Sequence, residues 1–350
     1  MRWHPQCEYW TGFERSYLSE FPKALTPARS WNTMANTVSL PVRSPLQLFA
    51  KDTLINGQPV QIECVEILGQ TYSITRGPLT TINLEDEWFE DLRDPEAVIE
   101  ILKNQTGFRA DVLTFWQRLP DIEPRYPFHQ EWDEIAVLES KSYDHWWNHK
   151  IKPRVRSLIR KAEKEGVVVR ETAYDDDFVK GMTVIFNEAP VRQGRRFWHY
   201  GKDFETVKKQ FSRYLHREHM IGAYLHGEMI GFIMLANAGT FGITGQIISS
   251  IRHRDKATNN ALIAKAVEVC EKRRLDHLVY LFWSDDSLSE FKRRCGFEKT
   301  LVPRYYVPLT ATGKIGMKLG AHRGWKAMLP KRVKASLKRL RSSWYESRKQ

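Results

Sequence analysis

The chain of 350 residues contains few cysteines, and none of them belongs to a paired motif. Cys7, Cys64, Cys270 and Cys295 are scattered, with no CxxC pair among them. This spacing argues against a disulfide framework, which needs a dense and regular cysteine pattern. We therefore expect reduced thiols in a cytoplasmic protein.

Long apolar runs are also missing. The N-terminus shows no signal peptide. Residues 229–251 carry no charge, but their four glycines and several polar side chains suit two strands around a turn better than a lipid-facing helix. We expect a cytoplasmic protein whose closest approach to a bilayer is a peripheral position on the inner face of the membrane.

No Walker motif, GxGxxG or Ser-His-Asp signature is present. His145 and His149 lie four residues apart, as in a helical metal site, but no HExxH motif or third ligand accompanies them. Histidines beside Trp146 and Trp147 are typical of packing residues. We therefore expect no metal site and no tightly bound cofactor.

Charge is unevenly distributed along the chain. The net charge is +12, and residues 311–350 alone contribute +11. Within this basic tail, residues 330–346 place Val333, Leu337, Leu340 and Trp344 on one helical stripe among cations. Such a helix suits an anionic membrane surface, although tRNA phosphates or a helix docked on its own domain remain alternatives.

The length allows about two domains, and the 42% hydrophobic content is enough for globular cores. We expect an irregular lead-in (1–40), a first domain (41–140), a linking helix (141–166), a second domain (167–310) and the basic tail (311–350). Hydrophobic periodicity predicts the elements of the first domain. They are a hairpin (60–67 and 72–75), a helix (87–103), a strand (111–116), a proline-rich loop (119–133) and a short strand (135–138).

A linking helix, interrupted at Pro153, leads to the second domain. The expected elements there are a strand (167–170), helices after the Asp175–Asp177 cap and over 204–217, a hairpin (224–233), a further strand (245–251), a helix (261–274), a strand (277–283), a helix (287–294) and a strand (299–308). Both domains contain a hairpin, a helix and a strand in that order. This order suggests an internal duplication, with chance similarity as the alternative.

The order of these elements, ending in Phe291-Lys292-Arg293-Arg294-Cys295-Gly296-Phe297, resembles the second half of a GNAT-type acyltransferase domain. The lysine after the phenylalanine is similar to the FemAB branch, which includes peptidoglycan aminoacyl transferases and BioF2-like acyltransferases. The resemblance covers residues 150–310 well and 40–140 faintly. It implies an α/β fold of two GNAT-like domains in tandem, with mixed sheets flanked by helices.

By this resemblance, the donor phosphates would lie on the turn at 254–261, where Arg254, Thr258, Asn259 and Asn260 precede and begin a helix. Ala257 and Asn259 occupy positions where the family has glycines, so an ordinary capped helix is the alternative. The resemblance also implies that Lys292 stabilises the reacting carbonyl. The alternative there is a solvated lysine beside Arg293.

Two arginine groups are candidates for binding an acceptor, because guanidinium groups match phosphate geometry. One lies on the linking helix and the other on the loop before residue 204; solvated or core-covering side chains are the alternative for both. The residues are Arg154, Arg156, Arg160, Arg195, Arg196 and Trp198.

The resemblance implies an acyltransferase that moves an acyl or aminoacyl group from acyl-CoA or aminoacyl-tRNA to an amine or hydroxyl. The acceptor would be a phosphate-bearing small molecule or a lipid-linked precursor of the cell envelope. Two alternatives remain: an acetyl-CoA-dependent N-acetyltransferase, and an inactive GNAT scaffold that binds membrane or RNA.

Overall fold

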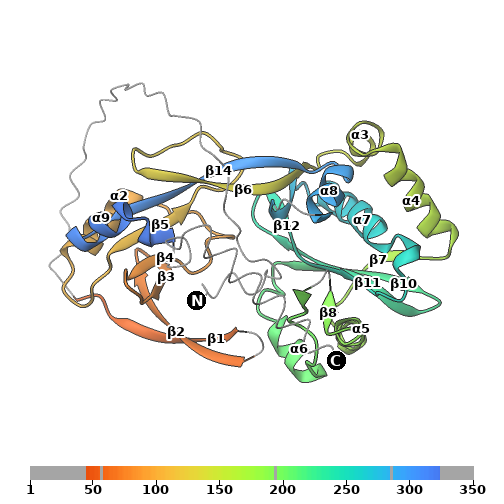
Figure 1. The fold of residues 1–350 in the computed structure, drawn as a ribbon, viewed down its shortest axis with the longest axis horizontal. Helices are drawn as coiled ribbons and strands as arrows, with labels where there is room; N and C mark the ends of the chain where they lie inside the picture. Colours follow the sequence, from red (N-terminus) through yellow and green to blue (C-terminus); the bar gives the residue numbers. More distant parts are fainter. Residues whose placement is uncertain (1–44, 56–57, 193–194, 284–286, 324–350) are drawn as a thin grey trace, which may run out of the picture.

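One mixed sheet runs through the computed structural model, which describes residues 45–55, 58–192, 195–283 and 287–323 (Figure 1). This architecture confirms the predicted fold class. From one edge to the other, its strands are β1 (Leu48–Ile55), β2 (Gln58–Ile67), β3 (Gln70–Thr75), β4 (Thr81–Leu84), β5 (Val112–Trp116), β14 (Glu298–Pro308), β6 (His129–Glu139), β13 (His277–Phe282), β12 (Phe241–Ser249), β11 (Glu228–Asn237), β10 (Glu218–Leu225) and β7 (Val168–Thr172). β8 (Val191–Arg192) and β9 (Arg195–Arg196) form a separate short hairpin.

Helices pack against this sheet and connect its strands. They are α2 (Pro95–Asn104), α3 (Tyr143–His145), the π-helix η1 (Trp146–Lys150), α4 (Pro153–Lys164), α5 (Asp176–Phe186), α6 (Phe204–Gln210), the 3-10 turn η2 (Arg254–Lys256), α7 (Thr258–Lys272), α8 (Ser287–Arg294), α9 (Ala311–Lys318) and the 3-10 turn η3 (Ala321–Arg323). Among the described residues, no helix is long and apolar enough to cross a membrane. The predicted amphipathic stripe at 330–346 and the predicted lead-in at 1–40 lie outside the described residues.

The strand order is symmetric about the centre of the sheet. The series β2, β3, β4, α2 and β5 corresponds to β10, β11, β12, α7 and β13. In each series the last two strands are parallel and share a short ladder, with two residue pairs between β4 and β5 and three between β12 and β13. This correspondence agrees with the predicted duplication.

The two halves exchange their final strands. β6 pairs with β13 of the second half, and β14 inserts between β5 and β6 (Figure 1). One hydrophobic core accordingly contains Trp116 and Val302 together with Phe178 and Phe186. The predicted domain boundaries stay a prediction, because the sheet and this core both contain residues from either side of residue 140.

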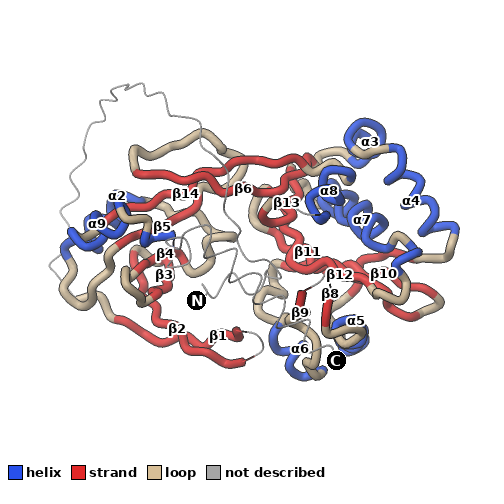
Figure 2. Tube along the Cα trace, in the orientation of Figure 1, coloured by secondary structure: helices blue, strands red, loops and turns tan. Residues whose placement is uncertain are grey.

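Strand β11 is buried on both faces. Phe232 and Met234 pack with α5 and α6, whereas Ile233 and Leu235 pack with α4 and α7. Alternation of successive side chains produces this arrangement. Figure 2 shows the same layers, with α4 and α7 on one side of these strands and α5 and α6 on the other.

Three predicted boundaries were wrong for tertiary reasons. The first concerns β6, which begins at His129 inside the predicted loop. Its polar residues enter the sheet because the neighbouring strand β14 supplies cations that reach them diagonally: Arg304 Nε lies 2.7 Å from Asp133 Oδ2, and Lys299 Nζ lies 2.6 Å from Glu134 Oε1.

The predicted helix at 87–103 begins instead at Pro95. The Asp94 side chain accepts a hydrogen bond from the amide of Ala97, and proline at the first helical position has no amide to satisfy. Helix α6 ends at Gln210 rather than Arg217. Beyond it the chain turns so that Tyr214 donates a 2.6 Å hydrogen bond to Asp86.

Candidate functional site

The parallel strands β12 and β13 separate after a short ladder. The ladder begins at Phe241 and His277 and ends at Ile243 and Val279, although β12 continues to Ser249. The edge of β12 beyond Ile243 therefore lies outside the ladder with β13. A strand edge that is not paired with its neighbour can hydrogen-bond an extended ligand.

Lys292 of α8 contacts β13 just beyond this point. Its side chain is only 2% exposed, and Nζ donates to the carbonyls of Tyr280 and Phe282 at 2.7 and 2.8 Å. Between these residues, Leu281 has a φ of 48° and the register of β13 on β6 shifts. The ammonium thus binds the carbonyls of a bulge in β13, at a position where β12 no longer pairs with β13.

The surroundings of Lys292 compensate the cost of burying its charge. Nζ lies 4.4 Å from the centre of the Tyr280 ring, and the two carbonyls replace bonds to water. Burial raises the pKa of the Tyr280 hydroxyl, so this ring stays neutral. Lys292 is therefore not a solvated member of the basic run, and its catalytic role stays a prediction.

The π-helix η1 fixes the end of α8. The buried Trp146 donates from Nε1 to the carbonyl of Cys295 at 2.9 Å, and a side chain on Gly296 would meet that same nitrogen at 3.3 Å. Asn260 at the start of α7 also contacts Cys295, with 3.7 Å between Nδ2 and Sγ. These contacts fix α8, which carries Lys292, relative to α7.

Helix α7 is not the ordinary capped helix that the sequence offered as an alternative. The N-cap is Ala257, which makes no side-chain capping bond and has a φ of 55°. Thr258 is buried against β11, where a side chain on Gly231 would meet its methyl group at 2.7 Å. Ala257 thus adopts the left-handed conformation that glycine takes most easily, at a cost of about 1–2 kcal/mol. The first-turn amides of such a helix favour an anion.

Arginines surround the start of α7. Arg254 is exposed in η2, and Arg192 approaches it from β8. Burial lowers the pKa of Arg192, and the charge of Arg254 lowers it further while Glu188 opposes the shift. Arg192 donates to the carbonyl of Ser249 at 2.8 Å. Two guanidinium groups therefore share the region where β12 ends.

Glu188 organises this region, and no sequence pattern predicted its role. Its buried carboxylate accepts from Ser250 Oγ and from the amide of Ile251, both at 2.5 Å, and pairs with Arg192 at 3.4 Å. A lone glutamate after a helix gives no periodic signal. The available sequence signal was that Glu188 lies two residues before Pro190 and that an arginine, Arg192, follows this proline.

The arginines of α4 do not converge on Lys292. Arg154 is exposed, Arg160 lies 5.5 Å from the Trp147 ring, and Arg156 donates to the carbonyls of Trp147 and Ile151 at 2.8 and 3.0 Å. Arg156 thus closes the end of η1. Through Lys161, whose Nζ donates to the carbonyl of Asp255 at 2.7 Å, α4 also supports the turn before α7.

The remaining candidates lie on or just after the hairpin that carries Arg192. Arg196 is exposed, Trp198 is 50% exposed, and Phe197 packs under the Arg192 guanidinium at 4.6 Å. Arg195 belongs to β9, and its side chain lies outside the described residues. The structure thus groups Arg196 and Trp198 with Arg192 rather than with α4.

No protein-family model matches the chain, and no curated protein sequence does either. Solved structures similar to this chain include those of FemX and L-PGS. FemX is 12% identical, with a TM-score of 0.50 over 78% of this chain and 90% of FemX. L-PGS from Bacillus licheniformis is 12% identical, with a TM-score of 0.47 over 73% of this chain and 86% of L-PGS. The fold assignment rests on FemX, whose fold this chain shares.

Proposed function

We propose that this chain is an acyltransferase, which moves an acyl or aminoacyl group from a thioester or tRNA ester to an amine or hydroxyl. The observation that carries the proposal is the separation of β12 from β13 beside the start of α7. The fold shared with FemX supports it. Fold alone does not fix function, so the proposed activity depends on the residues of the site.

The donor would bind through its phosphates and its acyl chain. Acyl-CoA and aminoacyl-tRNA both carry phosphate groups, which the first-turn amides of α7 and the Arg254 guanidinium suit. The acyl group would then extend along β12 beyond Ile243, where the strand edge is outside the β13 ladder. No tightly bound cofactor is needed in this scheme.

The reaction would proceed by attack of the acceptor nitrogen or oxygen on the donor carbonyl. A new C–N or C–O bond forms, the C–S or C–O bond to the donor breaks, and the acceptor's proton passes to the leaving thiolate or alkoxide. Holding both substrates together and stabilising the oxyanion would supply the rate. Lys292, fixed on β13, is the candidate source of positive charge there.

The acceptor would be a phosphate-bearing small molecule or a lipid-linked envelope precursor. Arg196 and Trp198 are exposed beside the Arg192 cluster and offer a guanidinium and an aromatic face for such a molecule. Arg154 and Arg160 lie on α4, so they would contact the acceptor only if the acceptor were large enough to reach that helix.

One observation favours acyl-CoA, and hence acetyl-CoA-dependent N-acetylation, as the second candidate function. Ala257 keeps the left-handed backbone of a glycine turn although it carries a side chain. Asp255, whose charge opposes phosphate, pairs with Lys256 at 3.3 Å. The turn thus keeps the backbone shape of an anion-binding turn, and the negative charge of Asp255 is partly neutralised by Lys256.

The Arg254→Ala substitution tests donor binding. Loss of a charge-assisted hydrogen bond costs about 1.5–3 kcal/mol, so affinity for the correct donor falls about tenfold or more. Titration calorimetry with coenzyme A and filter binding with aminoacylated tRNA identify which donor binds the full-length protein.

Arg274→Ala is the matched control, because Arg274 is exposed just past the opposite end of α7. It should leave affinity unchanged. Equal losses in both variants indicate nonspecific charge attraction, and absence of binding to either donor contradicts the proposed function in favour of an inactive scaffold.

We also propose that residues 330–346 bind an anionic membrane surface. Flotation with vesicles of phosphatidylglycerol and phosphatidylcholine should recover the full-length protein, and Leu337→Glu/Leu340→Glu should abolish recovery because it removes the apolar stripe. Lys338→Gln serves as a control and should weaken recovery by about 1 kcal/mol or less. Binding that persists in the Leu→Glu variant, or that tRNA competes away, means that the tail is not a membrane anchor.

A further inference from the structure

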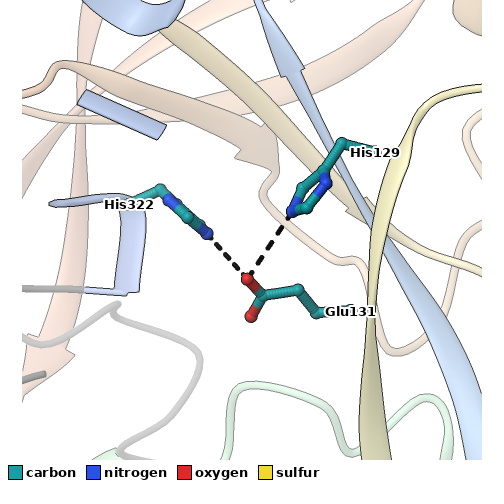
Figure 3. Close-up of side chains that lie close together, drawn as sticks. All are labelled: His129, Glu131 and His322. Carbon is teal, nitrogen blue, oxygen red and sulfur yellow. Dashed lines mark hydrogen bonds and ion pairs between the residues drawn. The ribbon is translucent and has the colours of Figure 1, made fainter. Parts of the chain in front are cut away.

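Two histidines and a glutamate converge at the far end of β6 from the parted strands (Figure 3). His129 and Glu131 are two residues apart on β6, and His322 belongs to η3, the last turn that the structure describes. In Figure 3 both imidazoles point their nitrogens at the same carboxylate oxygen. The three groups thus come from segments almost 200 residues apart in the chain.

The distances between these atoms are close to those of a ligand set. His322 Nε2 lies 2.7 Å from Glu131 Oε1, His129 Nε2 lies 3.7 Å from it, and all three ligand atoms lie within 4.8 Å of one another. Around tetrahedral zinc, with bonds near 2.0–2.2 Å, neighbouring ligand atoms are about 3.3–3.5 Å apart. Movements of about 1 Å of side chains would therefore complete the set.

Packing holds one of the imidazoles in place. The His322 side chain is only 2% exposed, and its ring contacts the Tyr306 ring with 4.8 Å between centroids. His129, by contrast, is 51% exposed and leaves a route to solvent. A fixed ligand beside an accessible one allows an ion to enter and to keep a solvent molecule in its fourth position.

We propose that His129, Glu131 and His322 bind a divalent transition-metal ion, with zinc as the best match. Two imidazoles and one carboxylate form a donor set that zinc accepts in proteins, whereas calcium and magnesium prefer oxygen ligands alone. The ion would fasten the segment from α9 to η3 onto β6. It would thereby fix the point from which the basic tail at 324–350 continues.

An ion pair competes with the metal for the same carboxylate. Arg323 Nε donates to Glu131 Oε1 at 2.8 Å, and His322 bonds to that oxygen as well. Zinc must displace Arg323, whose side chain is 47% exposed and free to swing into solvent. Removal of Arg323 therefore distinguishes the two cases. It should strengthen binding at a metal site, whereas it should weaken a purely structural ion pair.

The test uses the full-length protein and zinc chloride alone. After treatment with a chelator, the protein is equilibrated with zinc, passed through a desalting column and analysed for metal, and affinity is measured by competition with a chromogenic chelator. We expect about one zinc per chain in the wild type. His129→Asn should weaken binding by at least about tenfold, since even outer-shell partners contribute that much. Its half-exposed position makes misfolding a minor concern.

Two further variants complete the design. Arg323→Ala should tighten zinc binding by up to about tenfold, because it removes the competitor for Glu131. His145→Asn/His149→Asn is the matched control: these imidazoles are exposed and 5.0 Å apart between centroids, and they lie on α3 and η1 rather than on β6 or η3, so the change should leave affinity unaltered. The metal site is overturned if zinc binding survives His129→Asn, falls equally in the control, or weakens in Arg323→Ala. In that case the three residues form an ion pair that holds η3 against β6.

Discussion

Replacing Lys292 with methionine should lower turnover about 100-fold while changing the Michaelis constant for the donor by less than about threefold. Methionine keeps the apolar length of the side chain and removes the ammonium, which donates to two carbonyls of the β13 bulge. If that charge acts on the transition state, kcat falls and ground-state binding does not. Steady-state kinetics with the donor identified by the binding experiment measure both constants.

Arg293→Met is the control for this substitution. Arg293 is the next residue of α8, is exposed and pairs with Glu290 rather than with β13. Its replacement should leave kcat unchanged, and urea unfolding of both variants separates lost catalysis from lost stability. If the Lys292→Met enzyme is folded and turns over at the wild-type rate, the role of Lys292 is limited to stabilising the bulge of β13.

Replacing Arg304 with methionine should reduce the free energy of unfolding by about 3–5 kcal/mol. The Arg304 side chain is buried, with Nη1 and Nη2 at 2.9 and 3.1 Å from Glu87 and Nε at 2.7 Å from Asp133. It joins β14 and β6, the exchanged strands, to the turn after β4. Removing the guanidinium leaves two buried carboxylates without the cation that compensates their desolvation.

The control for the buried pair comes from the same two strands. Lys299 and Glu134 form an exposed bridge at 2.6 Å, so Lys299→Met should cost about 1 kcal/mol or less. Replacing Glu87, Asp133 and Arg304 together with apolar residues should restore most of the lost stability. Chemical denaturation measures all three variants. Equal costs for Arg304→Met and Lys299→Met would show that the buried cluster does not hold the halves together.

Local patterns were sufficient to predict much of this fold. Helix α7 buries Leu262, Ile263, Ala266, Val267 and Cys270, as the periodicity indicates, and Asp175 caps α5. The phrase around Lys292 located the candidate catalytic residue. In each case the signal lies within about a dozen residues, so no information from distant segments was needed.

Features that depend on distant segments were missed. Nothing local in β6 shows that His129 to Asp133 can enter a sheet, because the partner strand, β14, lies about 170 residues later. The hydrogen bonds of Glu188 with Ser250 and Ile251, and of Glu131 with His322, likewise join residues that are far apart in the sequence. The His-x-Glu spacing on one face of a strand was the available signal for that last group.

Hydrogen–deuterium exchange with and without donor would show whether the donor binds between β12 and β13 at the start of α7. This experiment needs no knowledge of the acceptor. Acyl-CoA or aminoacyl-tRNA, at a concentration close to its dissociation constant, should slow exchange of amides at 244–249 and 257–261, and Arg254→Ala should strongly reduce this protection at the same concentration. Unchanged exchange in both segments with either donor, or protection confined to other parts of the chain, would contradict the account.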